Sequence, residues 1–209
     1  MKIVIFGASG RTGQHLISQA LEQGHEVTAF ARTPGKIRTN HEGPRVIQGD
    51  IHNLDVVGQA TAGQDAVLCA LGVNKNDSVT ALADGTRNII QAMKQHGVRR
   101  ILNVPAAGFS GERADFLTGK ILFWIFNRYL TKLFSAMKEQ HKAIEQSALD
   151  WTAVRPFLLD EGPRKGDYRI ALEGIPSKGS RINTGDVAEF MLKNMESDEY
   201  LLKAPALAY

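Results

Sequence analysis

The sequence predicts an α/β protein with a Rossmann-like, doubly wound parallel sheet in a single domain that spans residues 1–209. One observation is a glycine-rich turn at residues 7–13, which follows an apolar run at residues 3–6. The other is the alternation of short apolar runs with helical patterns as far as residue 105. This alternation favours right-handed βαβ units around a parallel sheet.

The glycine-rich turn connects the first predicted strand to a helical pattern at residues 15–22. Glycine permits a sharp turn and lets the backbone approach a phosphate, and the N–H groups that begin a helix attract anions. The spacing is G-x-x-G-x-x-G rather than the commoner G-x-G-x-x-G. The alternative is a turn that only packs strand against helix. We expect a dinucleotide pyrophosphate to be held by Gly7, Ser9, Gly10, Arg11, Thr12 and Gly13.

The end of the second predicted strand, residues 26–31, is basic. Residues 27–41 contain no Asp or Glu, whereas Arg32, Lys36 and Arg38 lie there. An acidic residue at this place would bind the ribose 2′-hydroxyl, whereas a guanidinium suits a 2′-phosphate. We therefore predict NADPH as the cofactor, with Arg32 and Lys36 on its 2′-phosphate. A solvent-facing basic loop is the alternative.

Residues 45–50, which end in Gly49-Asp50, and the apolar run at residues 65–72 predict two more strands, and a short helix is expected between them at residues 54–60. Ligands of open parallel sheets bind beyond the carboxyl ends of the strands. We expect Asp50 and Ile51 beside the adenine. The fourth strand should add contacts from Ala70, Leu71 and Gly72.

A long helical pattern at residues 80–96 ends at Gly97, which is a C-cap signal. The next apolar run, residues 100–105, predicts the fifth strand. Its carboxyl end should bring Val104 and Pro105 to the cofactor.

The regular pattern breaks at residues 106–148. An apolar run at residues 121–126 is too short to span a bilayer, which takes about 20 residues. Three interpretations stay open: a buried helix core, a wall or lid over the active site, and a dimer or membrane-surface patch. A helix should continue from this region as far as Leu149.

The rest of the chain predicts a sixth strand at residues 151–156 and a strand or hairpin arm at residues 167–172. The last helix should cover residues 184–195, with Thr184 as its N-cap. Residues 201–209 should add an edge strand.

Charge and cysteine content exclude several classes of protein. The formal net charge is +3, and no aromatic interleaving suits single-stranded nucleic acid, so nucleic-acid binding is not expected. The single cysteine, Cys69, lies in an apolar run and is predicted to be a core residue in a reducing compartment. No signal peptide, transmembrane segment or metal site is expected, so the protein is predicted to be cytoplasmic.

The sequence resembles the atypical short-chain dehydrogenases that bind NADPH, and among them the biliverdin-IXβ reductase (flavin reductase) family. The resemblance covers nearly the whole chain. It rests on Gly7-Ala-Ser-Gly-Arg-Thr-Gly13, Gly49-Asp50, Gly85-Thr-Arg-Asn-Ile-Ile90, Ala92-Met-Lys-Gln-His-Gly-Val98 and Asp198-Glu-Tyr200. It implies hydride transfer from a nicotinamide to flavins, quinone-like molecules or linear tetrapyrroles, in an open pocket over the nicotinamide.

The chain departs from this family at the expected catalytic positions. Ala106 stands where the flavin reductases have a serine, and Leu158 replaces a histidine. The segment at residues 112–135 is divergent, with the character of a helix or lid. No catalytic residue is assigned; the candidates for proton transfer are Ser110 and His141. The substrate pocket is expected to be lined by Ala106, Phe109, Trp124, Phe157 and Leu158.

These observations predict an NADPH-dependent reductase of a small aromatic or redox molecule such as a flavin, acting as a monomer or weak dimer. The missing serine keeps a second hypothesis open, a weakly catalytic or non-catalytic NADPH-binding redox sensor.

Overall fold

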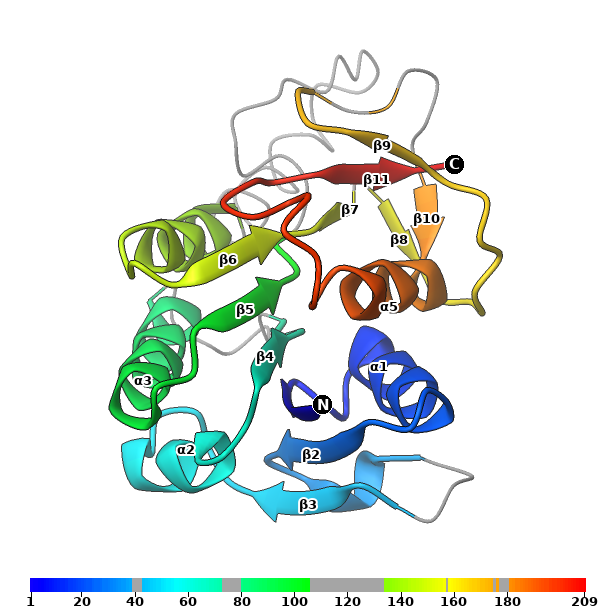
Figure 1. Ribbon diagram of the computed structural model, residues 1–209. Coiled ribbons are helices and arrows are strands. Elements are labelled where there is room, and N and C mark those ends of the chain that lie inside the picture. The colour runs from blue at the N-terminus through cyan, green and yellow to red at the C-terminus, as the bar shows by residue number, and fades with distance from the viewer. Residues whose placement is uncertain (39–42, 73–79, 106–133, 157, 175, 177–180) are drawn as a thin grey trace, which may run out of the picture.

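The computed structural model describes residues 1–38, 43–72, 80–105, 134–156, 158–174, 176 and 181–209 (Figure 1). Its centre is a six-stranded sheet in which all neighbours are parallel, in the order β3-β2-β1-β4-β5-β6. The strands are β1 (Lys2–Phe6), β2 (Glu26–Ala31), β3 (Arg45–Gln48), β4 (Ala66–Cys69), β5 (Arg100–Asn103) and β6 (Asp150–Ala153). This order confirms the predicted doubly wound fold, and it reverses direction between β1 and β4.

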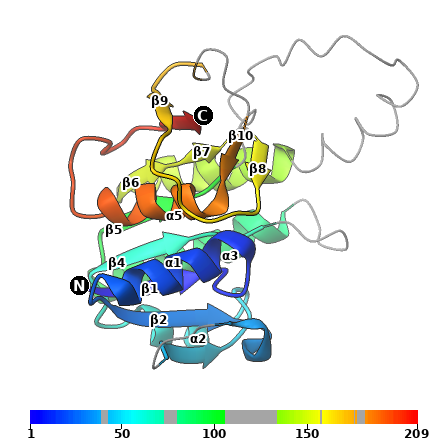
Figure 2. The same ribbon diagram turned by 90° about the vertical axis from the view of Figure 1, so that its right-hand side faces the viewer.

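Helices cover both faces of this sheet (Figures 1 and 2). α1 (Arg11–Glu22) and α5 (Thr184–Lys193) pack on one face. α2 (Leu54–Thr61), α3 (Ala81–His96) and helical residues 134–145 pack on the other. Side chains alternate between the two cores as a strand requires, so Ile3 and Ile5 face α1, whereas Val4 and Phe6 face α2 and α3. Burial on both faces explains the continuous apolar strands.

Of the two predicted helix caps, the one at Gly97 is confirmed and the one at Thr184 is not. Asn53 caps α2 by accepting hydrogen bonds from the N–H groups of Asp55 and Val56. Gly97 ends α3 in the left-handed conformation, at φ +70°. The prediction of Thr184 as an N-cap is wrong, because Asn183 is the cap and Thr184 is the first helical residue.

The C-terminal part of the chain builds two small sheets beside β6 and α5. β8 (Leu158–Asp160) pairs in parallel with β10 (Arg181–Asn183). β7 (Arg155–Pro156), β11 (Ala206–Ala208) and β9 (Arg169–Ala171) form a three-stranded sheet with β11 at its centre.

Two strand predictions are corrected by this arrangement. The predicted sixth strand is two strands, because the chain leaves the main sheet after β6 and the N–H of Arg155 bonds to the carbonyl O of Pro205 at 2.9 Å. The predicted edge strand near the C-terminal end is central, since β11 pairs in parallel with β7 and antiparallel with β9. Both differences arise from long-range pairing that no local pattern encodes.

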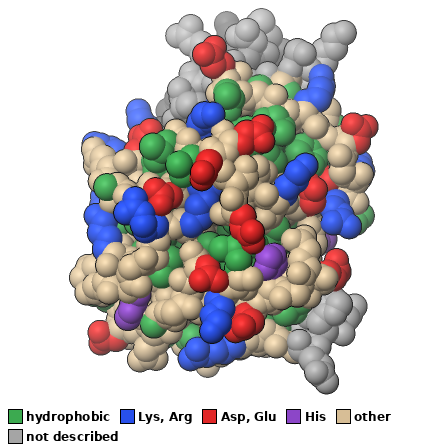
Figure 3. All heavy atoms as spheres, viewed as in Figure 1, with side chains coloured by type: hydrophobic (Ala, Val, Ile, Leu, Met, Phe, Trp, Pro, Cys, Tyr) green, Lys and Arg blue, Asp and Glu red, His purple; other side chains and the backbone are tan. Residues whose placement is uncertain are grey.

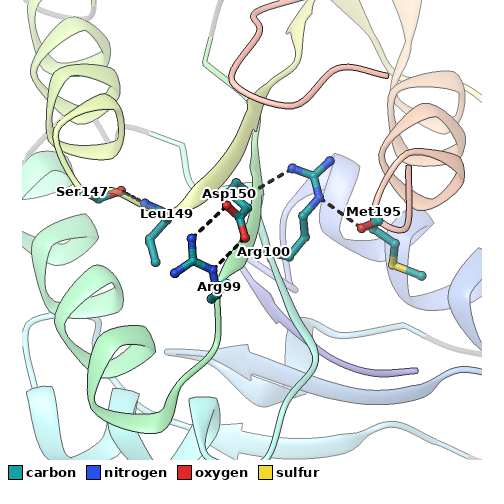
Figure 4. Close-up of polar contacts among 6 residues, drawn as sticks. All are labelled: Arg99, Arg100, Ser147, Leu149, Asp150 and Met195. Atoms are coloured by element: carbon teal, nitrogen blue, oxygen red, sulfur yellow. Dashed lines mark hydrogen bonds and ion pairs between the residues drawn. The ribbon is translucent and has the colours of Figure 1, made fainter. Parts of the chain in front are cut away.

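Arg100 ties the end of α5 to the central sheet (Figure 4). Its guanidinium donates to the carbonyl oxygens of Asn194 and Met195, at 2.7 and 3.1 Å, and to that of Asp150 at 2.9 Å. These bonds satisfy backbone acceptors at and just beyond the end of the helix. The neighbouring Arg99 instead forms an exposed ion pair with the Asp150 carboxylate, at 2.9 Å.

Candidate functional site

A cleft of about 360 Å³ lies at the carboxyl ends of β1, β2 and β4. This is the edge of the sheet where the strand order reverses, and ligands of doubly wound folds bind there. The lining residues are Gly7, Ser9, Gly10, Phe30, Ala31, Arg32, Thr33, Lys36, Asp50, Ile51, His52, Ala70, Leu71, Gly72, Ala81 and Leu82.

The glycines of the first turn are required by the backbone that surrounds them. Gly7 has φ +82°, and a Cβ added there would lie 2.4 Å from the carbonyl O of Ala70. A Cβ on Gly13 would lie 2.2 Å from the carbonyl O of Gly7. The N–H of Gly10 donates to that same carbonyl O at 2.9 Å, which closes the turn. The β1 turn, the β4 end and α1 therefore come closer together than side chains would permit.

The first turn of α1 is suited to an anion. Its N-cap is Gly10, which has no side-chain acceptor, and the turn contains no acidic residue. The first N–H groups of a helix have no acceptor within the helix, so here they are available to a ligand at the end of the cleft. This cradle of bare backbone and helix terminus fits a pyrophosphate.

Positive charge lines the cleft at the end of β2. Arg32 and Lys36 are both lining residues, and a short 3₁₀ turn at Pro34–Lys36 connects them to each other. The N–H of Lys36 bonds to the carbonyl O of Thr33 at 3.1 Å, and Gln48 donates to the carbonyl O of Arg32 at 3.4 Å. The backbone that carries both charges is thus held in place.

Another part of the wall follows β3. The Asp50 carboxylate accepts a hydrogen bond from the N–H of His52 at 2.9 Å, which fixes a tight turn. The carbonyl O of Ile51 accepts from Asn88 of α3 at 2.9 Å. A Cβ on Gly85 would lie 2.2 Å from Cδ1 of Ile51, so α3 packs directly against this turn. Packing by α3 therefore orients the residues predicted to contact an adenine.

The structure brings together most of the residues predicted to bind the cofactor. Those that line the cleft are Gly7, Ser9, Gly10, Arg32, Lys36, Asp50, Ile51, Ala70, Leu71 and Gly72. Five others are not lining residues, and they lie in the first turn of α1 and after β5: Arg11, Thr12, Gly13, Val104 and Pro105.

The predicted substrate and catalytic residues are less well defined. Leu158 lies on β8 with 43% of its surface exposed and is not a lining residue of the cleft. The remaining candidates, Ala106, Phe109, Ser110, Trp124 and Phe157, lie outside the described residues.

His141 is buried in the helical face of the core. Its Nε2 lies 3.4 Å from the Glu145 carboxylate, and its ring meets Trp151 edge to face, with centroids 5.3 Å apart. Burial lowers the pKa of His141, which favours the neutral ring. His141 is not among the residues that line the cleft.

Sequence reasoning missed six lining residues: Phe30, Ala31, Thr33, His52, Ala81 and Leu82. Three of them adjoin predicted contacts, so position alone could have indicated Ala31, Thr33 and His52. Ala81 and Leu82 begin α3, and their place beside the cleft follows from the packing of α3 on Ile51.

Other kinds of site find no support in the part of the chain that the structure describes. No cluster of three or more His, Cys, Asp or Glu side chains there could hold a metal ion. No helix in the described ranges has both the length and the apolar character needed to cross a membrane. Basic and acidic side chains are interspersed on the face shown in Figure 3.

The sheet order and the cleft define a dinucleotide-binding protein of the Rossmann type. The chain belongs to the NAD(P)H-binding family, whose model matches residues 7–198. It is similar to the uncharacterized protein YwnB of Bacillus subtilis, with 28% identity over 206 residues, 96% of this chain and 94% of that protein. It is also 27% identical to the photosystem II assembly factor Ycf39 of Synechocystis, over 97% of this chain and 61% of that protein.

Solved structures share the fold. A short-chain dehydrogenase/reductase from Veillonella parvula, in complex with NADP, superposes with a TM-score of 0.82 at 21% identity, over 100% of this chain and 94% of that one. A candidate NADH-flavin reductase from Streptococcus pneumoniae has a TM-score of 0.78 at 21% identity, over 100% of this chain and 99% of that one. Together with the family model, these relatives place the chain in an NAD(P)H-binding, Rossmann-type fold.

Proposed function

We propose that this protein is an NADPH-dependent reductase that passes a hydride to a flavin, a quinone-like molecule or a linear tetrapyrrole. The observation that carries the choice of NADPH is the pair of cations, Arg32 and Lys36, in the wall of the cleft. Residues 27–41 contain no Asp or Glu that would repel a 2′-phosphate. The planar guanidinium of Arg32 suits two phosphate oxygens at once, and Lys36 adds a second charge.

The other residues of the cleft supply the rest of the cofactor site in this proposal. Backbone at residues 7–13 and the N-terminus of α1 hold the pyrophosphate. Asp50 and Ile51 flank the adenine, while Ala70, Leu71 and Gly72 continue the cleft toward the nicotinamide. The bound cofactor would supply a hydride, and the protein orients it and excludes competing reactions.

The choice of acceptor follows from what the chain lacks. Ala106 provides no hydroxyl after β5, and the family resemblance would have a serine there. Reduction of a carbonyl needs a proton donor near the developing oxyanion. Reduction of a flavin depends first on ring stacking and distance, and water can supply its proton. Acceptors of the flavin or quinone kind are therefore favoured over simple aldehydes and ketones.

The proposal is tested by following NADPH oxidation with FMN, a benzoquinone, biliverdin and an aliphatic aldehyde. We expect turnover with at least one of the first three and little with the aldehyde. Ala106→Ser should raise the rate with the best acceptor, since it restores a hydroxyl. If that variant has the rate of the parent protein, a serine at this position has no catalytic role in this chain.

A second candidate function is a redox sensor that binds NADPH without turning it over. The alanine at position 106 favours it, because the residue thought to assist reduction is missing. Submicromolar NADPH binding with no oxidation by any acceptor in the panel would support the sensor over the reductase.

A further inference from the structure

Asn103, the last residue of β5, is a buried amide. It is 0% exposed, and neither its Oδ1 nor its Nδ2 has a hydrogen-bond partner among the residues that the structure describes. A buried amide without hydrogen bonds is costly, so native proteins rarely keep one unless a water, an ion or a ligand meets it.

The side chain of Asn103 points to the face covered by α3 and helical residues 134–145. Ile101 lies in the core on that face and Leu102 in the opposite one, so the alternation of the strand places Asn103 with Ile101. Its Cα neighbours across the sheet, Cys69 of β4 and Ala153 of β6, both belong to the same core.

Other polar side chains gather at this point. Gln140 is 1% exposed, and its Nε2 lies 3.0 Å from Oγ1 of Thr86 and 3.8 Å from Sγ of Cys69. The Thr86 hydroxyl donates to the carbonyl O of Leu82 at 2.8 Å. Cys69 is the cross-strand neighbour of Asn103, so Asn103 lies beside a small buried polar cluster made of Thr86, Gln140 and Cys69, within an otherwise apolar core.

This cluster lies directly behind the wall of the cleft. Leu82, which receives the Thr86 hydrogen bond, is a lining residue, and Ala70 follows Cys69 into the lining. β5 is the next strand beyond β4, on the side away from Arg32 and Lys36. If those cations hold the ribose phosphate, as in the proposed function, the end of β5 lies toward the reacting end of the cofactor.

We propose that Asn103 is a positioning residue that holds a buried water molecule behind the reacting end of the cleft, and that this water supplies the proton for reduction of the acceptor. An amide offers one donor and one acceptor group, which suits a water that must be oriented. Asn103 itself gives up no proton. This inference rests on the proposed function.

The proton balance makes such a water useful. Full reduction of an oxidised flavin takes up two electrons and two protons, of which the hydride brings both electrons and one proton. The second proton comes from the water, and the hydroxide that remains is reprotonated from solvent. The cluster adds no competing acid, because burial raises the pKa of the Cys69 thiol to about 12 and leaves it neutral.

The test compares Asn103→Leu, which fills the site with apolar atoms, with Asn103→Ala, which leaves room for water. The proposal predicts that Asn103→Leu is the more stable variant, yet lowers the acceptor-reduction rate at least tenfold. Asn103→Ala should be less stable but faster than Asn103→Leu, and NADPH affinity should change less than twofold in both. A purely packing role predicts that the rates follow stability, with Asn103→Leu the better enzyme, and that result would overturn the proposal.

Gln19→Leu is the matched control. Gln19 is also a buried amide whose oxygen has no partner among the described residues. It lies on α1, where its Nε2 donates to the carbonyl O of Gly185 of α5, and it is not a lining residue of the cleft. Its substitution should leave the reduction rate and the solvent deuterium isotope effect unchanged, whereas Asn103→Leu should enlarge the solvent isotope effect, because proton delivery to the acceptor becomes rate-limiting.

A readout without turnover separates this inference from the proposed function. A crystal structure of the cofactor-free protein at 1.5 Å or better should show a water within about 3.2 Å of Oδ1 or Nδ2 of Asn103. A dry site overturns the proposal whatever the kinetics show. If the parent protein binds NADPH but reduces no acceptor, that result contradicts the proposed function. It also contradicts the role of the water as proton donor, even if the water is present.

Discussion

A Cβ on Gly7 would lie 2.4 Å from the carbonyl O of Ala70, so the turn after β1 and the end of β4 are in backbone contact. This contact closes the floor of the cleft between the two strands at which the sheet order reverses. The proximity of the two backbones explains why the first residue of the turn is glycine.

Gly7→Ala is expected to damage both the fold and the cleft. The variant combines a positive φ with a backbone clash, so the free energy of unfolding should fall by more than about 2 kcal/mol. NADPH affinity should fall at least tenfold in calorimetry. Gly58→Ala in α2 is the control, because its added methyl would lie 3.6 Å from Nε2 of His96, an ordinary contact. That variant should bind normally; a stable, tightly binding Gly7→Ala protein would refute this account of the turn.

Arg100→Met should destabilise the protein more than Arg99→Met. Arg100 is half-buried and bonds to backbone carbonyls near the end of α5, whereas Arg99 forms one exposed ion pair. Loss of the bonds at Arg100 should lower Tm by about 5–10 °C in calorimetry. Arg99→Met should change Tm little, since exposed pairs contribute little. Equal effects of the two variants would be inconsistent with the role assigned to Arg100.

The Cys69 thiol should make stability fall at alkaline pH. Burial raises its pKa to about 12 in the folded protein, above the ordinary value of 9.0. The folded state therefore keeps a proton that the unfolded state loses, so stability falls as pH rises from about 9 to 12, with a slope of at most about 1.4 kcal/mol per pH unit. Urea titrations of the parent and Cys69→Ala across this range measure the difference. Rapid reaction of the native thiol with a thiol reagent at pH 8 would contradict the burial.

Tyr209→Phe should loosen the C-terminal part of the chain. The Tyr209 hydroxyl donates to the buried Asp186 carboxylate at 2.5 Å, and that carboxylate also accepts from the N–H groups of Lys165 and Gly166. Removing the hydroxyl should cost about 1–3 kcal/mol, because it leaves the buried carboxylate with one donor fewer. Chemical denaturation checks the loss, and a double-mutant cycle with Asp186→Asn should show coupling between the two side chains. Additive effects would mean that the hydrogen bond contributes nothing.

The sequence predicts the inner strands of the main sheet well because they are buried on both faces and rich in apolar residues, whereas β3 at the edge is largely exposed. The run at residues 151–156 hides a change of sheet after β6, because the pairing of Arg155 with Pro205 depends on contacts far along the chain. Asn183 and Thr184 are both good capping residues, so composition alone does not choose between them.

The candidate site, like the fold, could be predicted from the sequence only in part. Gly7, Arg32 and Asp50 could be predicted because motifs and strand ends mark them. Asn103 could not be singled out, since a polar residue at the end of a strand gives no sign in the sequence that its amide will be buried without partners.

The central claim is that Arg32 and Lys36 select the 2′-phosphorylated cofactor, and calorimetric titration with NADP⁺ and NAD⁺ tests it most directly. We predict that the parent protein binds NADP⁺ at least tenfold more tightly, and that Arg32→Asp reverses this preference by repelling the 2′-phosphate. Equal affinity of the parent for the two nucleotides, or an unchanged preference in Arg32→Asp, would contradict the account.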